Sequence, residues 1–288
     1  MEVVAYRPEM AGDLATHYNQ QAAGVPFCWP ITGEHVATAV ENAGDLDHAG
    51  SRAVLDGGHV CGFGMYGVER KEDRNRGIIR FLCYERGNRR TGQTLLKAVE
   101  SELDVHGVEE IEAFPQEHRI EPYHLRAAFL SDRLDHVQAL FAINGYARDR
   151  GEVFLLWNDA PELPAEPVDG LEFDVKWIDT DCALLDLKVG MTCDGVHVGQ
   201  CDHVSAATFT GHADAQEMAF CIWLGVPGAH QGRGYGAIVL RRAMALLRER
   251  GYRHLAISTE HSNHRAFVFY ANHGYRVADW TWNYRLKR

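Results

Sequence analysis

Residues 217–250, EMAFCIWLGVPGAHQGRGYGAIVLRRAMALLRER, decide the fold of this chain. An apolar run of strand length, 217–226, leads into the glycine-rich turn QGRGYG at 231–236, and an apolar helical pattern follows over 237–250. Glycines permit positive φ angles and a close approach of ligand to backbone. The first turn of a helix offers free N–H groups at the positive end of its dipole. Strand, turn and helix in this order predict an anion site at the helix start.

Two familiar phosphate loops do not fit this turn. A Walker loop needs Lys and then Ser or Thr after its last glycine, whereas Ala237 and Ile238 follow Gly236. A dinucleotide fingerprint, GxGxxG, needs its third glycine three positions after the second, and that position holds Ala237. From Val226 to Arg253 there are six arginines and one glutamate, so the local charge is 6 − 1 = +5 in a chain of net charge −11. This balance favours a local phosphate ligand and argues against nucleic-acid binding.

A second motif stands at the right distance from the turn. Residues 263–275, NHRAFVFYANHGY, resemble the NxxAxxFYxxxGF signature of the GNAT superfamily of N-acetyltransferases, and QGRGYG resembles that family's Gln/Arg-x-x-Gly-x-Gly/Ala loop. The specific resemblance covers 217–288. A weaker version covers 77–157, so the whole chain resembles a tandem GNAT protein. The expected fold is α/β (α+β), with two tandem GNAT-like domains, each a mixed, mostly antiparallel sheet flanked by helices.

The resemblance implies direct transfer of an acetyl group from acetyl-CoA to an amine while both are bound. The loop that would hold the pyrophosphate consists of Gln231, Gly232, Arg233, Gly234, Tyr235 and Gly236. The strand end that would pair with the pantetheine amides and polarise the acetyl carbonyl consists of Leu224, Gly225 and Val226. Asn263 would hydrogen-bond the cofactor arm.

Two catalytic roles follow from the same resemblance. Tyr270 would lie near the sulfur and protonate the departing thiolate, the alternative being an aromatic core residue. A general base is also needed, because an alkylammonium is not a nucleophile near neutral pH. Glu217 and Glu260 are the preferred candidates, with Asp214 and His261 nearby in sequence. Each of these is also compatible with a solvated charge, and a water chain could replace a direct base.

The clearest boundary is the segment 160–170, APELPAEPVDG, whose prolines recur every third residue and favour an extended path. It divides the chain into a domain of residues 1–160, a linker of 161–170 and a catalytic domain of 171–288. Both halves repeat one order of elements. Six helices are expected: 13–22, 34–42, one that follows the turn RRTGQT (89–94) and ends near His106, 136–143, 237–250 and 263–272. Residues 171–216 are expected to be mostly extended.

The first half lacks the residues that would face a cofactor. Its loop positions hold Arg89, Gly92 and Thr94, and the positions of the motif's asparagine and tyrosine hold Leu134 and Phe141. A β-branched threonine obstructs the approach that glycine permits. These losses predict a degenerate copy that either helps to shape the acceptor pocket or is purely structural.

Composition bounds the remaining possibilities. The 288 residues include seven cysteines, an odd number without a CxxC, so neither a disulfide framework nor a metal site is expected. No signal peptide or membrane segment is recognised, which favours a cytoplasmic protein.

The expected partner is a small-molecule amine acceptor or a protein amine, and the chain is expected to be a monomer or homodimer. The rival is a non-catalytic acyl-CoA-binding or regulatory protein, and a thiol or hydroxyl acceptor is a third possibility.

Overall fold

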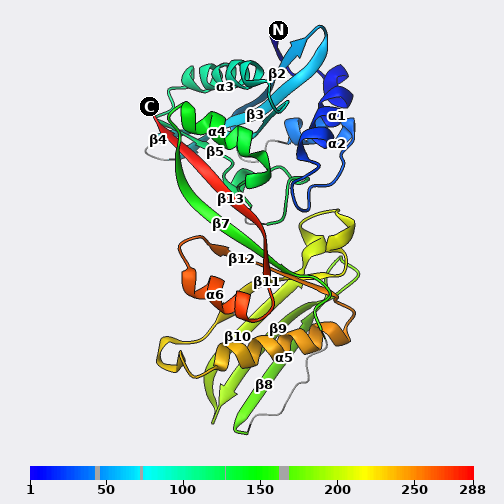
Figure 1. Cartoon of the computed structure of the whole chain (residues 1–288), viewed down its shortest axis with the longest axis vertical. Helices are drawn as coiled ribbons and strands as arrows, with labels where there is room; N and C mark the ends of the chain where they lie inside the picture. The colour runs from blue at the N-terminus through cyan, green and yellow to red at the C-terminus, as the bar shows by residue number, and fades with distance from the viewer. Residues whose placement is uncertain (43–45, 72–73, 127, 162–168) are drawn as a thin grey trace. The chain divides into compact units, whose positions relative to one another are not determined.

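The computed structural model describes residues 1–42, 46–71, 74–126, 128–161 and 169–288 (Figure 1). Contacts divide the chain into two compact units. Unit 1 comprises Met1–Val153, Glu260–Ser262 and Asp279–Arg288, and unit 2 comprises Phe154–Thr259 and Asn263–Ala278. Each unit holds a mostly antiparallel sheet with one parallel strand pair and flanking helices, which confirms the predicted α/β (α+β) class.

The two units are defined by contacts in the structure, and each contains separate stretches of the chain. The predicted domains, 1–160 and 171–288, are instead continuous stretches of sequence. The chain returns to unit 1 at its C-terminal end, because Asp279–Arg288 pairs with strands of that unit. Residues 162–168 of the predicted proline-rich linker lie outside the described residues.

Unit 1 is built on a sheet in the order β1-β2-β3-β4-β5-β13, antiparallel except for the parallel pair β4–β5. Its strands are β1 (Glu2–Ala5), β2 (Asp47–Asp56), β3 (His59–Lys71), β4 (Arg74–Tyr84), β5 (Glu110–Ala113), β6 (Leu130–Ser131) and most of β7 (Ala147–Trp157) and β13 (Arg276–Lys287). Its helices are α1 (Ala11–Ala22), α2 (Gly33–Glu41), α3 (Arg89–Asp104) and α4 (Asp135–Ile143), with short 3-10 turns at Pro8–Met10, Gln116–His118 and Asp132–Leu134.

Helices cover both faces of this sheet. Side chains alternate between the two faces of a strand, and on β3 a Cβ at Gly64 would lie 3.3 Å from Val99 of α3. The residue before it, Phe63, meets His17 of α1 with ring centroids 6.2 Å apart. Helices α1 and α3 therefore lie on opposite faces. The buried cluster of unit 1 also includes Tyr284 of β13, at 2% exposure, so the C-terminal strand is part of this core.

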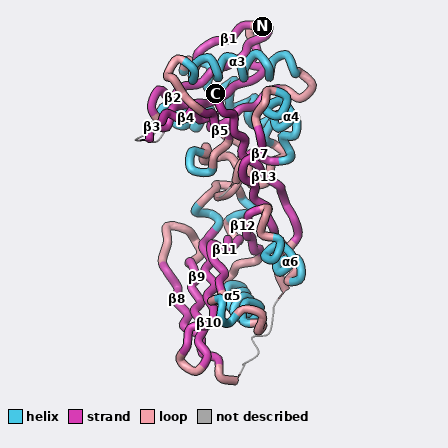
Figure 2. Tube along the Cα trace, turned by 90° about the vertical axis from the view of Figure 1, so that its left-hand side faces the viewer, coloured by secondary structure: helices cyan, strands magenta, loops and turns pink. Residues whose placement is uncertain are grey.

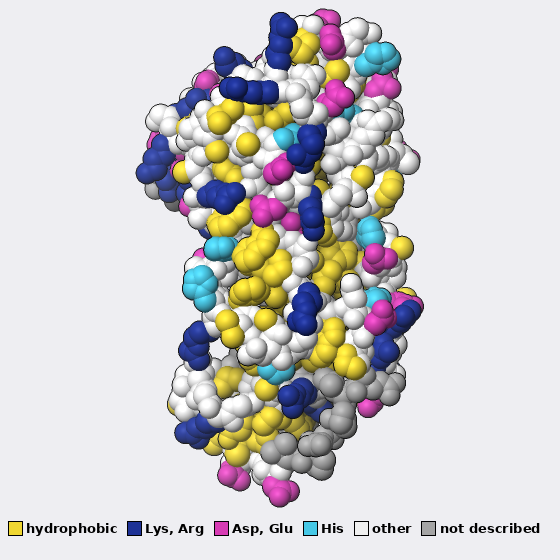
Figure 3. Space-filling model, viewed as in Figure 1, with side chains coloured by type: hydrophobic (Ala, Val, Ile, Leu, Met, Phe, Trp, Pro, Cys, Tyr) yellow, Lys and Arg dark blue, Asp and Glu magenta, His cyan; other side chains and the backbone are white. Residues whose placement is uncertain are grey.

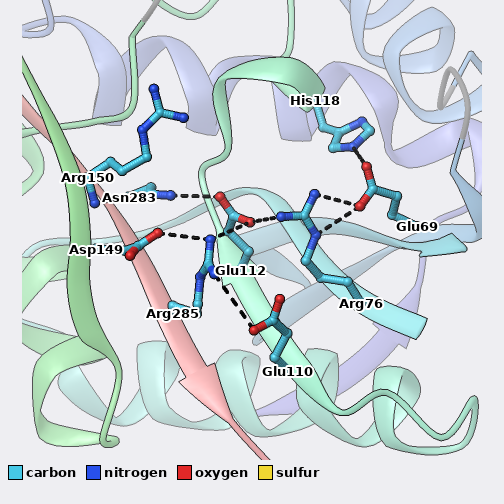
Figure 4. Close-up of polar contacts among 9 residues, drawn as sticks. All are labelled: Glu69, Arg76, Glu110, Glu112, His118, Asp149, Arg150, Asn283 and Arg285. Carbon is cyan, nitrogen blue, oxygen red and sulfur yellow. Dashed lines mark hydrogen bonds and ion pairs between the residues drawn. The ribbon is translucent and has the colours of Figure 1, made fainter. Parts of the chain in front are cut away.

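A network of charges, partly buried around the buried Glu112, joins β13 to the middle of the unit 1 sheet (Figure 4). Arg76 of β4 donates to Glu69 of β3 at 2.5 and 2.9 Å and also contacts Glu112 of β5. From β13, Asn283 donates to Glu112 at 2.7 Å. Arg285 approaches the Glu112 carboxylate at 3.5 Å. Burial of these charges is tolerated because each carboxylate has a positive or amide partner.

Unit 2 has the sheet order β12-β11-β10-β9-β8, and α5 packs on β9 and β10 (Figure 2). Its strands are β8 (Leu171–Ile178), β9 (Asp186–Cys193), β10 (Val196–Ser205), β11 (Met218–Gly225) and β12 (His254–Glu260). Its helices are α5 (Tyr235–Glu249) and α6 (His264–Asn272), with 3-10 turns at Ala206–Thr208, Ala213–Ala215 and Gly228–His230. The described residues of unit 2 before β11 hold no α-helix, as the alternating pattern of 171–216 predicts.

Strand β11 changes partners along its length. Its parallel ladder with β12 runs from Met218 opposite His254 to Cys221 opposite Ile257. Its antiparallel ladder with β10 continues to Gly225 and skips Ile222, which forms a bulge. Beyond Cys221, the described ladders therefore pair β11 on one side only, and its other edge is left open near the glycine-rich turn.

On the face displayed in Figure 3, basic and acidic side chains are interspersed. Among the described helices, none combines the length and the apolar character that crossing a membrane requires.

Candidate active site

The glycine-rich turn ends in an open helix start. Gly232 and Gly234 have φ angles of +78° and +84°, the left-handed region that favours glycine. Gly234 is the N-cap of α5, and its carbonyl accepts from the N–H groups of Ala237 and Ile238 at 3.0 and 3.2 Å. A glycine N-cap has no side chain to occupy the N–H groups that follow it, and no described side chain caps this end. The start of α5 is thus an exposed cluster of donors.

A pocket of about 580 Å³ opens at this helix start. Its walls come from the end of β11, the turn, the first residues of α5 and one face of α6. Of the residues predicted to bind the cofactor, it is lined by Leu224, Gly225, Val226, Gln231, Gly232, Gly234, Tyr235, Gly236, Asn263 and Tyr270. Arg233 lies in the same turn but is not a lining residue. Two motifs that are about 30 residues apart in sequence therefore meet around one cavity.

Side chains in the turn hold its shape. The Gln231 side-chain amide donates to the Val226 carbonyl at 3.1 Å, which closes the loop between β11 and α5. A Cβ at Gly236 would lie 3.7 Å from both Phe269 of α6 and Val226, an ordinary contact distance. The sequence predicts that the backbone N–H of Gln231 binds an anion. In addition, the Gln231 side chain holds the loop closed.

Asn263 has a structural role beside its place in the pocket. It is the N-cap of α6, and its Oδ1 accepts from the N–H of Ala266 at 3.2 Å. Asparagine is a favoured N-cap for this reason. The side chain retains its amide NH₂, which can donate to a ligand in the pocket. The capping bond therefore fixes the orientation of the Asn263 side chain and of its NH₂ donor.

Tyr270 lies in the wall of the pocket at 5% exposure. Its ring contacts Phe269 and Tyr275, with centroids 5.3 and 5.5 Å apart. Burial raises the pKa of Tyr270 well above its ordinary value, and the nearby thiols of Cys221 and Cys201 raise it further. The phenol is therefore fully protonated across the physiological range and carries a proton that can be given away.

The proposed bases are not among the residues that line this pocket. Glu217 precedes β11, seven positions before Leu224, and forms a 3.6 Å ion pair with Arg253. At about 3.3 Å per residue, seven positions along a strand span roughly 23 Å. Glu260 is the exposed last residue of β12 and belongs to unit 1. Asp214 is an exposed residue of a 3-10 turn.

His261 also belongs to unit 1, where its ring packs against Trp280 and Trp282 with centroids 5.2 and 4.6 Å apart. The structure therefore brings the cofactor candidates and Tyr270 together in one cavity of unit 2, but none of the four candidate bases lines that cavity.

Three basic residues of the pocket wall were not predicted: His230, Arg265 and His273. Arg265 stands inside the NxxA motif, where only the fixed positions drew attention. The His273 ring makes a 2.8 Å hydrogen-bond contact between Nδ1 and the carbonyl of Phe269. The placement of Arg265 and His273 could have been inferred from the helical period, because Arg265, Phe269 and His273 follow one another at intervals of four along one face of α6.

The corresponding helix start in unit 1 is closed. The sequence predicts that RRTGQT is a turn before the helix. In the structure these residues form the first turns of the helix, because α3 begins at Arg89. Asn88 caps this end, and its side chain accepts from the N–H of Thr91 at 3.2 Å. A Cβ at Gly92 would lie 2.6 Å from the Tyr84 ring, so this glycine is required for packing.

The second motif is also altered in unit 1. Leu134 is the N-cap of α4 and makes no side-chain capping bond, in contrast to Asn263. Phe141 is completely buried and stacks on Tyr284 with centroids 5.6 Å apart. These two residues contribute to packing rather than to a polar cavity.

Comparisons with known proteins agree with this geometry. The model of the family described as "Acetyltransferase (GNAT) family" matches residues 155–275. No curated protein sequence matches the chain.

Several solved structures share the fold over nearly the whole chain. A tandem GNAT protein from the clavulanic acid biosynthesis pathway has a TM-score of 0.62 at 15% identity, with 99% of this chain and 98% of that chain covered. A GCN5-related N-acetyltransferase from Sphaerobacter thermophilus has a TM-score of 0.60 at 16% identity, with coverages of 99% and 95%.

A third structure is the glucosamine N-acetyltransferase region of a fungal multi-domain GH3 beta-N-acetylglucosaminidase. It has a TM-score of 0.63 at 14% identity, and this chain covers 38% of that longer protein. At these identities the similarity establishes the fold alone. Residues 155–275 belong to the GNAT acetyltransferase family, a family of acyltransferases, and the chain as a whole has the fold of a tandem GNAT protein.

Proposed function

We propose that this chain is an acetyl-CoA-dependent N-acetyltransferase in which unit 2 binds the cofactor and transfers its acetyl group directly to an amine. The observation that carries this proposal is the uncapped start of α5 at Gly234, which opens into a pocket shared with the end of β11, Asn263 and Tyr270. Helix N-termini with free N–H groups bind phosphates. The pyrophosphate of CoA would occupy this position.

The open edge of β11 would receive the pantetheine arm. Past Cys221 this edge has no described strand partner, so the backbone groups of Leu224 and Gly225 can pair with the amides of the cofactor. A backbone N–H aimed at the acetyl carbonyl would stabilise the negative charge that develops on its oxygen as the amine attacks. The guanidinium of Arg265 lines the same pocket and favours an anionic ligand.

Tyr270 would supply the proton for the leaving thiolate. Its phenol has an ordinary pKa of about 10 and is protonated near neutral pH, and burial raises that pKa further. Transfer to a thiolate is uphill in water, where the two groups have ordinary pKa values of about 10 and 8.5. Inside a closed site the thiolate is also desolvated, which raises its affinity for a proton.

The amine must lose a proton before it attacks. No carboxylate is among the residues that line the pocket, so the proton would leave through a water chain, with Glu217 and Glu260 kept as candidate final acceptors. A small polar amine remains the preferred substrate class, with a protein amine as the alternative. The glucosamine named for one structural neighbour is an amine of the first kind.

Unit 1 would not bind acetyl-CoA. Its helix start is capped by Asn88, and the tyrosine of the motif is replaced there by the buried Phe141. Calorimetric titration of the full chain with acetyl-CoA is therefore expected to give one site per chain. A stoichiometry of two would contradict this assignment, and no binding would remove the basis of the proposal.

The absence of a carboxylate from the residues lining the pocket also favours a second candidate, a non-catalytic acyl-CoA-binding protein. Release of free thiol from acetyl-CoA, followed across a panel of polyamines, amino sugars and peptide amines, separates the two. Turnover with any amine supports the transferase. Tight binding of acetyl-CoA without thiol release across the panel supports the binding protein.

A further inference from the structure

Three buried side chains of unit 2 gather beside the point where β11 leaves β12. Cys201 and His203 are alternate residues of β10, so they point to the same face of the sheet. The bulge at Ile222 sets Cys221 of β11 directly opposite His203. Exposure is 0% for Cys201, 1% for His203 and 3% for Cys221. One candidate ligand atom of each, a sulfur or a ring nitrogen, lies within 4.8 Å of the other two.

Two thiols and an imidazole are a donor set for a thiophilic metal ion. Zinc binds cysteine sulfur at about 2.3 Å and histidine nitrogen at about 2.0–2.1 Å, in tetrahedral geometry. Ligand atoms at these distances are separated from one another by roughly 3.5–3.8 Å. The distance between Cys201 Sγ and His203 Nδ1 is 3.7 Å. The remaining separations need a decrease of at most about 1.3 Å, which rotation of a cysteine side chain can supply.

The present contacts of the three groups are weak. The Cys221 thiol donates to the carbonyl of Trp223 at 3.4 Å. His203 Nδ1 contacts the Cys201 sulfur at 3.7 Å, so Nδ1 is the ring nitrogen that faces that thiol. The other nitrogen, Nε2, is buried and has no hydrogen-bond partner among the described residues. A disulfide fits the arrangement less well, because the register partner of Cys201 is Leu224 rather than Cys221.

We propose that Cys201, His203 and Cys221 bind one thiophilic metal ion of the Zn²⁺ class. Binding would form two metal–sulfur bonds and one metal–nitrogen bond and release the two thiol protons to solvent. The three protein ligands leave one coordination position for water or another donor. Since Cys221 is also the last residue of the β11–β12 ladder, the ion would tie β11 to β10 immediately before the open edge. This site would brace the strand end that the proposed function assigns to acetyl-CoA.

The test begins with the reduced 288-residue chain, expressed in zinc-supplemented medium and desalted. Elemental analysis is expected to give about one equivalent of zinc per chain. Replacement of the ion by Co²⁺ is expected to give thiolate-to-cobalt charge-transfer absorption and the intense visible bands of a tetrahedral site. Cys221→Ser and Cys201→Ser should each weaken Zn²⁺ binding by at least tenfold in competition with a chromophoric chelator. Cys182→Ser, another cysteine of unit 2, should bind zinc like the parent chain.

Several results would overturn the proposal. These are a metal-free parent protein that also gives no cobalt spectrum, equal zinc binding by the parent and both variants, or thiol titration in denaturant showing that Cys201 and Cys221 form a disulfide. The cobalt spectrum is recorded on the parent chain, so poor folding of a variant does not remove the test. Acetyl-CoA titration of the parent chain tests the proposed function separately, because the parent can lack the ion and still bind phosphate at Gly234.

Discussion

The side-chain oxygen of Asn88 accepts a hydrogen bond from the backbone N–H of Thr91 at 3.2 Å, and this bond closes the start of α3. The N-cap at the start of α5 is Gly234, which has no side chain. An N-cap side chain and a bound phosphate compete for the same N–H groups. One residue at each helix start thus distinguishes the two units in their capacity to bind an anion.

The substitution Gly234→Val should abolish detectable binding of acetyl-CoA, raising Kd by at least tenfold. A Cβ at this position meets no atom within 4 Å, but the φ angle of +84° is strongly unfavourable for a β-branched residue. The turn would relax and move its N–H groups away from the phosphate. Isothermal titration calorimetry measures the loss.

Gly58→Val provides the matched control. Gly58 lies in the β2–β3 turn of unit 1 and has a φ of +87°, and a Cβ added there would also meet no atom within 4 Å. It carries the same backbone strain in the unit that does not hold this pocket, so acetyl-CoA affinity should be unchanged. Equal effects of the two substitutions would show that strain, rather than loss of a phosphate site, weakens binding.

Much of unit 2 follows from sequence periodicity and turn chemistry. The helix predicted over 237–250 is α5 at Tyr235–Glu249, and that predicted over 263–272 is α6 at His264–Asn272. Both are marked by flanking glycines and by apolar residues at helical spacing. The cavity between them follows from the resemblance, because periodicity alone does not bring residues 234 and 270 together.

Other features depend on tertiary contacts that the sequence does not encode locally. The start of α3 at Arg89 is set by the Asn88 cap and by packing of Gly92 against Tyr84. The Cys–His cluster joins positions 201, 203 and 221, whose spacing matches no metal motif, and depends on the register of β10 and β11. Strand pairing, unlike helical period, is a long-range property.

The substitution Tyr270→Phe should lower kcat by about 10²–10⁴-fold and change KM for acetyl-CoA much less. The ring and its contacts remain, and only the proton donor is lost. Steady-state kinetics with the best amine of the panel would measure both constants. Tyr275→Phe is the control, since its hydroxyl is buried without a described hydrogen-bond partner. Parent-like turnover by Tyr270→Phe would assign the proton to another donor.

Replacement of Arg76 by methionine should destabilise unit 1 by about 1–3 kcal/mol, because the carboxylates of Glu69 and Glu112 would lose their shared partner. The loss is limited because Glu112 keeps its contacts with Asn283 and Arg285. Hydrogen exchange of β4 and β5 amides reports the local free energy of opening. Arg7→Met removes an exposed pair with Glu9 instead and should cost less than about 1 kcal/mol. Similar losses in both variants would contradict a special role of the buried network.

Unit 1 should lose stability in mild acid because of His17. Burial lowers the pKa of this histidine to about 4, from 6.5 in the unfolded chain. Below pH 6.5 the unfolded state takes up a proton that the folded state refuses, so stability falls with pH until both states are protonated near pH 4. At about pH 5, His17 lowers the free energy of unfolding of unit 1 by about 2 kcal/mol relative to neutral pH. His17→Leu should abolish this part of the loss, as measured by hydrogen exchange of β3 amides at about pH 7.5 and 5. His59→Leu, at an exposed position, should retain it; if both variants retain it, His17 does not cause the acid sensitivity.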